Sequence, residues 1–245
     1  MRVREIYDFL QSVSPFEKQE EWDNGGLQIG SLEDEIEEIV LALEVDDWVV
    51  ENLKPKSLLI VHHPLIFKGL RMLDFRSYPS LFIRKIIQKE CALIAMHTSF
   101  DVSHLNIHVA KEILGFRDAN QDENGIVYAQ LQTMTLKELT LNIKQSLRLP
   151  HIRFCDAGNK ISRVAVVCGS GFSLFSKIKN KEELCFLTGD VKYHDAMIAK
   201  ALGVSTIDIT HYESEIVFGE ILQRILQKQG YKAIITNPKN PFTYI

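Results

Sequence analysis

The chain has 245 residues, of which 46% are hydrophobic, and this is enough for one large or two modest cores. A formal net charge of −4 gives no general attraction for a polyanion, so the composition does not support nucleic-acid binding. The four cysteines lie far apart and form no C-x-x-C pair, which favours a reducing compartment. The N-terminal stretch MRVREIYDFL is charged and no apolar run is long enough for a bilayer, so we expect a cytoplasmic protein without a membrane partner.

The first half of the chain alternates short apolar runs with helix-like stretches. In chain order it predicts a helix at residues 4–13, strands at 39–45 and 57–62, a helix at 81–89, a strand at 91–97 and a helix at 105–114. This alternation is typical of β-α units and a mixed or largely parallel sheet.

The stretch FRDANQDENG then loses the hydrophobic pattern and predicts a junction. Beyond it, Thr135 and Glu138 have the spacing of a capping box and predict a helix to residue 147. Strands follow at 164–168, 185–187, 204–209 and 232–235, with helices at 196–202 and 214–229. We therefore predict an α/β protein of two lobes with mostly buried mixed sheets: lobe 1 of residues 1–120, completed by 215–245, and lobe 2 of residues 126–214. That the two lobes are related by duplication is a hypothesis at this point.

Polar or glycine-rich residues follow three apolar runs in each half of the chain. The first half has EVDD, HHP and HTSFD, and the second has CGSG, TGD and THYESE. Ligands of α/β sheets collect beyond the carboxyl ends of the strands, so these segments are the candidate site.

Imidazoles and carboxylates gather in these segments as His62 and His63, His97 with Asp101, and His211 with Glu215. This mixed set of donors suits zinc, manganese or ferrous iron, whereas calcium and magnesium prefer oxygen ligands alone. The neighbouring histidines aim at different points, which suggests two metals, and such a pair needs bridging carboxylates. The alternative is that a His-His pair is only a surface or hydrogen-bonded core feature.

The spacing of His211 and Glu215 allows two arrangements. Residues four apart lie on one face of a helix turn. Because the predicted helix begins about Ser214, His211 is instead expected on the preceding turn, with Glu215 in the first turn of the helix. The segment EWDNGGLQIG also has two interpretations, since its glycines predict a turn but also allow close approach of a substrate or a neighbouring subunit.

Taken together, EWDNGGLQIG, VHHPLIF, HTSFD, TGDVKYHDA and THYESE resemble the GTP cyclohydrolase I type 2 homologues, a family also named after the yeast NGG-interacting factor three. The resemblance covers essentially the whole chain. It implies two related α/β lobes around a metal cleft and a toroidal homohexamer. Some members of the family carry an extra domain inserted between the lobes, and we expect none here because the chain is too short to contain it. This sequence departs from the family pattern at three places. A larger apolar residue is expected at Gly25, a glycine-rich stretch at Ser103-His104-Leu105, and glycine at Thr210.

The resemblance also implies a site and an activity. His62, His63, Asp101, His211 and Glu215 would bind two divalent metal ions, and His97 and His194 would line the site as candidate catalytic residues. The implied substrate is an anionic nucleotide, and the implied reaction opens the ring of GTP and releases formate. The same residues fit a metal-dependent phosphohydrolase, or a metal-binding, metal-delivery or scaffold ring protein without catalysis.

Overall fold

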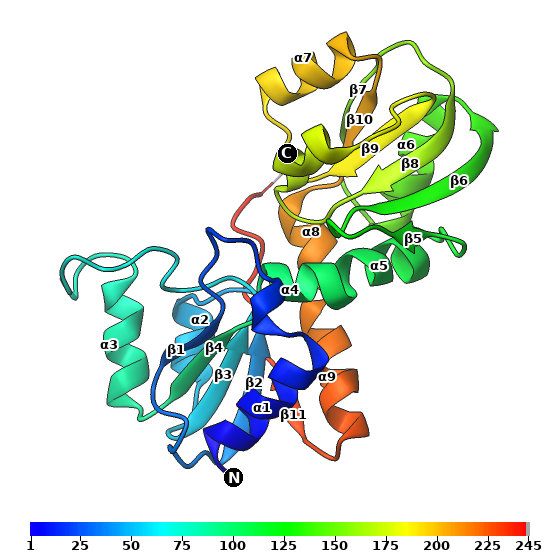
Figure 1. Cartoon of the computed structure of the whole chain (residues 1–245). Coiled ribbons are helices and arrows are strands. Elements are labelled where there is room, and N and C mark those ends of the chain that lie inside the picture. Colours follow the sequence, from blue (N-terminus) through cyan, green and yellow to red (C-terminus); the bar gives the residue numbers. More distant parts are fainter. Residues whose placement is uncertain (244–245) are drawn as a thin grey trace. The chain divides into compact units, whose positions relative to one another are not determined.

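The structure of the protein is a computed structural model, and it describes residues 1–243. The chain divides into two compact units (Figure 1). Unit 1 contains Met1–Ser103 and Ile216–Asn240, and unit 2 contains His104–Glu215 with residues 241–243. Each unit is mixed α/β and is built on its own mixed sheet. Among the helices that the structure describes, none is long and apolar enough to cross a bilayer.

Unit 1 has a five-stranded sheet in the order β1-β4-β3-β2-β11, in which β1 alone is antiparallel to its neighbour. Its elements in chain order are α1 (Val3–Val13), a 3-10 turn (Phe16–Lys18), β1 (Gly26–Ile29), β2 (Glu38–Ala42), α2 (Asp47–Asn52), β3 (Ser57–Val61), α3 (Ser80–Gln88), β4 (Ala92–Ala95), α4 (Thr98–Phe100), α9 (Phe218–Lys228) and β11 (Ala233–Ile235).

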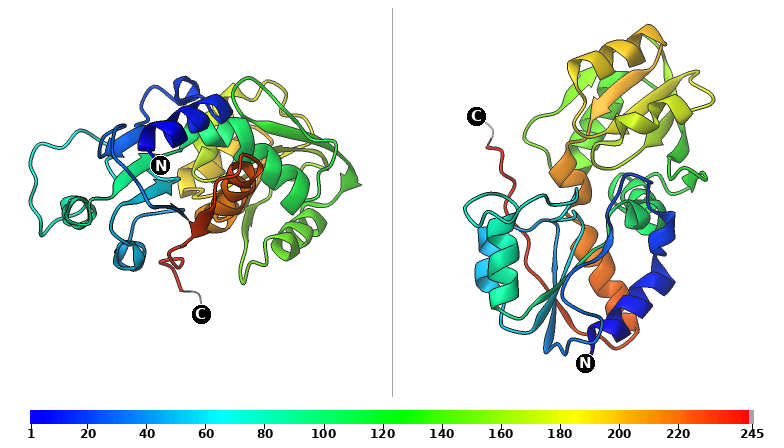
Figure 2. Two further views of the ribbon diagram at one scale, coloured as in Figure 1. Left: turned by 90° about the horizontal axis from the view of Figure 1, so that it is seen from below. Right: turned by 60° about the vertical axis from the view of Figure 1, so that its left-hand side comes forward.

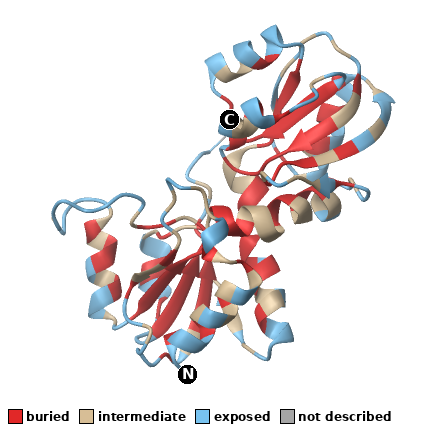
Figure 3. Ribbon diagram, viewed as in Figure 1, coloured by how far each residue is buried: buried red, intermediate tan, exposed pale blue. Residues whose placement is uncertain are grey.

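Helices cover both faces of the unit 1 sheet: α1 and α9 lie on one face, and α2 and α3 on the other (Figure 2). The sequences of β3 and β4 are apolar on both faces, and every residue of these strands is buried (Figure 3). Because β2, β3, β4 and β11 are parallel, their carboxyl ends share one edge of the sheet. The histidines of the HHP and HTSFD segments follow that edge.

Unit 2 has a six-stranded sheet in the order β5-β6-β8-β9-β10-β7, in which β8, β9 and β10 are parallel. Its elements are α5 (Asn106–His108) between π-helical segments (Asp101–Leu105, which begins in unit 1, and Val109–Ile113), β5 (Asn120–Gln121), β6 (Val127–Met134), α6 (Leu136–Ser146), β7 (Arg153–Cys155), β8 (Ile161–Val166), a 3-10 segment (Gly171–Lys177), β9 (Leu184–Thr188), α7 (Tyr193–Ala201), β10 (Ser205–Asp208) and α8 (His211–Glu215). The predicted capping box of Thr135 and Glu138 opens α6.

The boundary between the units falls at Ser103, earlier in the chain than the junction predicted near residue 120. Asn106 gives the physical reason, because its buried side chain donates to the Gly125 carbonyl at 3.0 Å and accepts from the Cys168 amide at 2.8 Å. Both partners belong to unit 2, so this helix is tied there although it follows the unit 1 sheet in sequence.

The predicted start of a helix at Ser214 is wrong, because α8 begins at His211 and a separate helix, α9, begins at Phe218. Serine is a common helix N-cap, but the Ser214 hydroxyl donates to the His211 carbonyl and accepts from the Gly169 amide instead. His211 and Glu215 therefore lie one turn apart on a single helix.

Candidate metal centre

Three histidines meet at the carboxyl edge of the unit 1 sheet. His62 and His63 follow β3, and His97 follows the neighbouring parallel strand β4. Each offers a ring nitrogen, and these three nitrogens lie within 4.8 Å of one another. The adjacent carboxyl ends of two parallel strands thus bring together residues that are far apart in the sequence.

His62 has its tautomer set by the backbone. Its Nδ1 donates to the Met96 carbonyl at 2.8 Å, so the neutral ring carries its lone pair on Nε2. That Nε2 lies 3.3 Å from Oδ1 of Asp101, a buried oxygen for which no hydrogen bond is found within residues 1–243. A nitrogen lone pair and a carboxylate oxygen at this distance repel each other unless a cation or a proton lies between them, so the pair fits a metal.

Carboxylates orient the other two histidines of unit 1. Nδ1 of His63 lies 2.8 Å from Glu44, and Nδ1 of His97 lies 2.8 Å from Asp23. An ionised carboxylate can only accept, so each Nδ1 donates and each Nε2 is left to face the cluster. Histidines that bind metals in proteins are held by this kind of outer hydrogen bond.

The side chain of Asp23 is buried and also ties the loop before β1 to α4. Its carboxylate accepts from the Thr98 amide at 3.0 Å and from the Thr98 hydroxyl. Burial would raise the pKa of Asp23, but the hydrogen bond and the charge of His97, together with the bonds from Thr98, lower that pKa below its ordinary value. The charged form is therefore the one that holds His97.

His211 and Glu215 of unit 2 form a second donor pair on α8. Nε2 of His211 lies 3.0 Å from Glu215, and its Nδ1 lies 2.6 Å from Asp190. Burial lowers the pKa of His211, but the hydrogen bonds and charges of Glu215 and Asp190 outweigh it and raise the pKa to about 9. Without a metal, the ring is thus an imidazolium between two carboxylates at neutral pH.

Gly169, in the CGSG segment after β8, leaves the room that Glu215 occupies. A Cβ at this position would lie 2.0 Å from Oε1 of Glu215 and 3.3 Å from Nε2 of His211. The residue also has φ +59°, a conformation that glycine adopts readily. Thr210, where the resemblance predicts glycine, has φ +61°, so the chain keeps the backbone conformation with a threonine.

The predicted ligands fall into two groups in the structure. His62, His63 and Asp101 lie with His97 in unit 1, whereas His211 and Glu215 lie in unit 2. His194 is exposed on α7, with its ring 5.2 Å from that of Tyr193, and its catalytic role stays a prediction.

Sequence reasoning did not assign a role to four residues of the candidate site: Asp23, Glu44, Asp190 and Gly169. Glu44, Asp190 and Gly169 belong to EVDD, TGD and CGSG, segments that the sequence had placed at strand ends. Asp23 belongs to EWDNGGLQIG, a segment that was interpreted from its glycines and not from its carboxylate. The available signal was a carboxylate in a segment already marked as a candidate.

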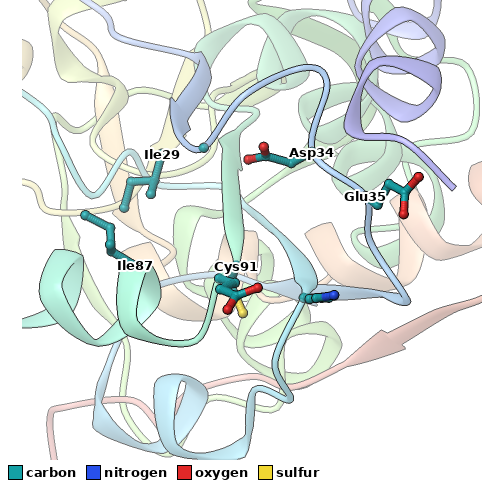
Figure 4. Close-up of a pocket in the computed structure, with 8 residues that line it drawn as sticks. Ile29, Asp34, Glu35, Ile87 and Cys91 are labelled. Atoms are coloured by element: carbon teal, nitrogen blue, oxygen red, sulfur yellow. The ribbon is translucent and has the colours of Figure 1, made fainter.

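A pocket of about 430 Å³ lies at the opposite edge of the unit 1 sheet (Figure 4). It is lined by residues that precede β3 and β4 or follow β1, including Lys56, Cys91 and Asp34. Burial raises the pKa of the Cys91 thiol, which keeps it protonated and a poor nucleophile. Among residues 1–243, none of the groups of His, Cys, Asp or Glu that could hold a metal ion includes a residue of this pocket.

Comparison with known proteins shows the family to which the chain is similar. Residues 1–241 match the model of the family Duf34/NIF3 (NGG1p interacting factor 3). The chain is 42% identical over 245 residues to a GTP cyclohydrolase 1 type 2 homolog of Campylobacter jejuni, covering all of both chains. It is also 42% identical over 243 residues to a GTP cyclohydrolase 1 type 2 of Helicobacter pylori strain J99, covering 99% of both.

Solved structures with this fold exist. A crystal structure of a hypothetical protein of Staphylococcus aureus superposes with a TM-score of 0.85 at 28% identity, over 100% of this chain and 99% of that one. The family model, the curated relatives and this structure each match the chain over almost its whole length. The chain therefore belongs to the Duf34/NIF3 family.

Proposed function

We propose that this protein is a metal-dependent hydrolase that acts on a nucleotide, opening the ring of GTP with release of formate. In the proposal, His62, His63, Asp101, His211 and Glu215 bind two divalent metal ions. The observation that carries it is the hydrogen bonding of the histidines: His62, His63, His97 and His211 each direct Nδ1 to an oxygen acceptor. Four such rings are oriented as metal-binding histidines are.

Divalent cations at these donors would supply the positive charge that stabilises a developing negative charge and attracts an anionic substrate. The chain's own residues have separable tasks. Glu44 and the Met96 carbonyl fix the rings of His63 and His62, so the donor atoms need not be ordered when a cation arrives. A cation therefore binds without the entropic cost of ordering these two rings, which raises its affinity.

His97 is the best placed residue for proton transfer. Its Nδ1 donates to buried Asp23, so Nε2 can accept a proton, and the carboxylate stabilises the imidazolium that results. Asp23 would act through His97 as a positioning residue. We retain His194 as a second candidate for proton transfer.

The relatives support the choice of substrate, because the protein of Helicobacter pylori is named GTP cyclohydrolase 1 type 2 and that of Campylobacter jejuni is named a homolog of it, and both match over almost the whole chain. The metal identity is proposed only as zinc, manganese or iron, since mixed imidazole and carboxylate ligands suit all of them.

The activity is tested by supplying GTP with Zn²⁺, Mn²⁺ or Fe²⁺ and identifying the products by mass spectrometry. Formate with a ring-opened guanine product supports the proposal. GDP or inorganic phosphate would instead indicate a metal-dependent phosphohydrolase. No turnover with any of the three metals would indicate a metal-binding, metal-delivery or scaffold protein.

We also propose that the chain assembles as a homohexamer in the cytoplasm. Exposed apolar side chains on α7 and its C-cap support self-association: Tyr193, Met197, Ile198 and Leu202. Light scattering tests this directly. A mass of six chains that falls in Met197→Asp supports both the assembly and this surface, whereas a wild-type monomer rejects the assembly.

A further inference from the structure

Two aromatic side chains form an exposed platform beside the histidine cluster of unit 1. The ring centroids of Trp22 and Phe67 lie 5.7 Å apart. Both rings meet the ring of His97 edge-on, with centroid distances of 5.9 Å for Trp22 and 6.2 Å for Phe67. Trp22 is 55% exposed and Phe67 is 43% exposed. Large apolar rings are thus presented to solvent directly beside the proposed chemistry.

The backbone beneath this platform is fixed by side-chain hydrogen bonds. Next to Trp22, the buried carboxylate of Asp23 is bonded to α4. Next to Phe67, the Ile66 carbonyl accepts from the side-chain amides of Asn24 and Gln28, and the Ile66 amide donates to Gln28. The two loops are therefore held together, and the rings are preorganised rather than loosely exposed.

We propose that Trp22 and Phe67 are the stacking surface for the purine base of the nucleotide, an inference that rests on the proposed function for the choice of ligand. The rings are in contact with each other, so the base would stack on their exposed faces and not between them. A planar heterocycle on this surface would lie beside His97, where a ring-opening reaction needs it. Aromatic stacking suits this task because every base has a π-face.

The charge of the adjoining loop fits the rest of such a ligand. Residues 67–78 carry three cations, Lys68, Arg71 and Arg76, against one carboxylate, Asp74. Arg76 lies 3.7 Å from Asp74, so the loop keeps a positive excess. A phosphate chain extending from a stacked base would be attracted to this segment although the whole protein is acidic.

The chain offers a built-in reporter, because its two tryptophans are Trp22 and Trp48. Trp48 is 60% exposed at the start of α2, so it matches Trp22 in type and exposure. In Trp48→Phe protein with metal chelated, GMP should quench the Trp22 emission saturably, and ribose 5-phosphate should not. Chelation excludes turnover, so this readout does not depend on catalysis.

The variants separate stacking from a structural role. Trp22→Ala should weaken GMP binding, measured calorimetrically, by about tenfold to a hundredfold, Trp22→Phe should retain it within a few-fold, and Trp48→Ala should leave it unchanged. Equal GMP affinity in Trp22→Ala, or equal quenching by ribose 5-phosphate, would overturn the inference. So would a Trp22→Ala protein whose metal content or oligomeric mass changes, because the rings would then be shielding the histidines or joining subunits.

Failure of this subsite and failure of the proposed function give different results. If the wild type opens GTP with the same KM as Trp22→Ala, the base does not stack on Trp22 but the hydrolase stands. If GMP binds through Trp22 but GTP is never opened, the subsite stands and the hydrolase does not.

Discussion

Asp190 lies 2.6 Å from Nδ1 of His211, while Nε2 of the same ring lies 3.0 Å from Glu215. The two carboxylates together raise the pKa of His211 to about 9, against the lowering effect of burial. A metal ion at Nε2 has to displace a proton that these carboxylates stabilise. Metal binding and proton release are therefore linked at this residue.

This linkage predicts a pH-dependent affinity. Below about pH 9 the folded, metal-free protein keeps His211 protonated, so Zn²⁺ binding should release a proton there and strengthen as the pH rises towards 9. Above about 9 this contribution should vanish. Calorimetric titrations in buffers of different ionisation enthalpy, at pH 7 and pH 9.5, measure the number of protons released.

Asp190→Asn provides the control for that titration. The variant loses one of the charges that raise the pKa of His211, so its proton release on zinc binding should decline at a lower pH than in the wild type. The same pH dependence of proton release in the two proteins would show that His211 does not give up its proton to the metal.

The raised pKa of His211 also makes the stability of the metal-free protein depend on pH. The folded pKa of His211 lies above its unfolded value of 6.5, so its contribution in metal-free protein is complete below about pH 6.5 and is lost as the pH rises through 9. Chemical unfolding of the chelated protein should show this decline, and His211→Gln should flatten it. An unchanged decline in the variant would assign it to other groups.

Gly169→Ala should remove metal without unfolding the chain. The new methyl would collide with Glu215, whose carboxylate would have to move away from His211. Gly158→Ala is the matched control, because Gly158 also has positive φ, +78°, but has nothing within 4 Å of its would-be Cβ. Both variants should lose about 1–2 kcal/mol of unfolding free energy.

Metal analysis distinguishes the two glycine variants. Only Gly169→Ala should lose bound metal, since only there does the methyl reach the ligands. Similar metal content in the two variants would mean that Glu215 is not a ligand or that its position is easily adjusted.

Glu44, which is not a proposed ligand but hydrogen-bonds the ligand His63, should raise the affinity for zinc. Glu44→Ala leaves His63 without its 2.8 Å partner, so the ring loses its orientation and zinc affinity should fall about tenfold to a hundredfold. Competition with a chromophoric chelator measures this, with exposed Glu37→Ala as the control. If Glu44→Ala binds zinc as tightly as the Glu37 variant, the hydrogen bond to His63 has no role in metal binding.

Asp23→Asn should separate catalysis from metal binding. An amide can bond His97 in the wrong tautomer, so kcat for GTP should fall by about 10²–10⁴-fold while the metal content stays that of the wild type. An unchanged kcat would remove His97 from the proton transfer step.

Much of the fold could be predicted because an apolar run is recognised from neighbouring residues alone. The runs at residues 57–62 and 91–97 became β3 and β4, and the donors after them marked the carboxyl edge. Strand β1 was missed, since a turn interpretation of Asn24-Gly25-Gly26 hid the pairing of Leu27 with Ile94. That pairing depends on a strand far away in the sequence.

The outer hydrogen bonds could not be predicted for the same reason. Asp23 and His97 are separated by 74 positions, and the spacing carries no information about their contact. The start of α8 was misplaced because Ser214 has a preference for helix N-caps, which is local, whereas its actual partner, Gly169, comes from another strand end. The residue types at the strand ends predicted the proposed metal ligands, but not the groups that orient these ligands by hydrogen bonds.

Whether the five proposed ligands bind metal is measured by elemental analysis of purified protein. We expect two divalent ions per chain in the wild type, a loss in His63→Ala and in Glu215→Ala, and no loss in His151→Ala, whose exposed histidine lies outside the proposed ligands. Retention of the wild-type metal content in both His63→Ala and Glu215→Ala would contradict this expectation.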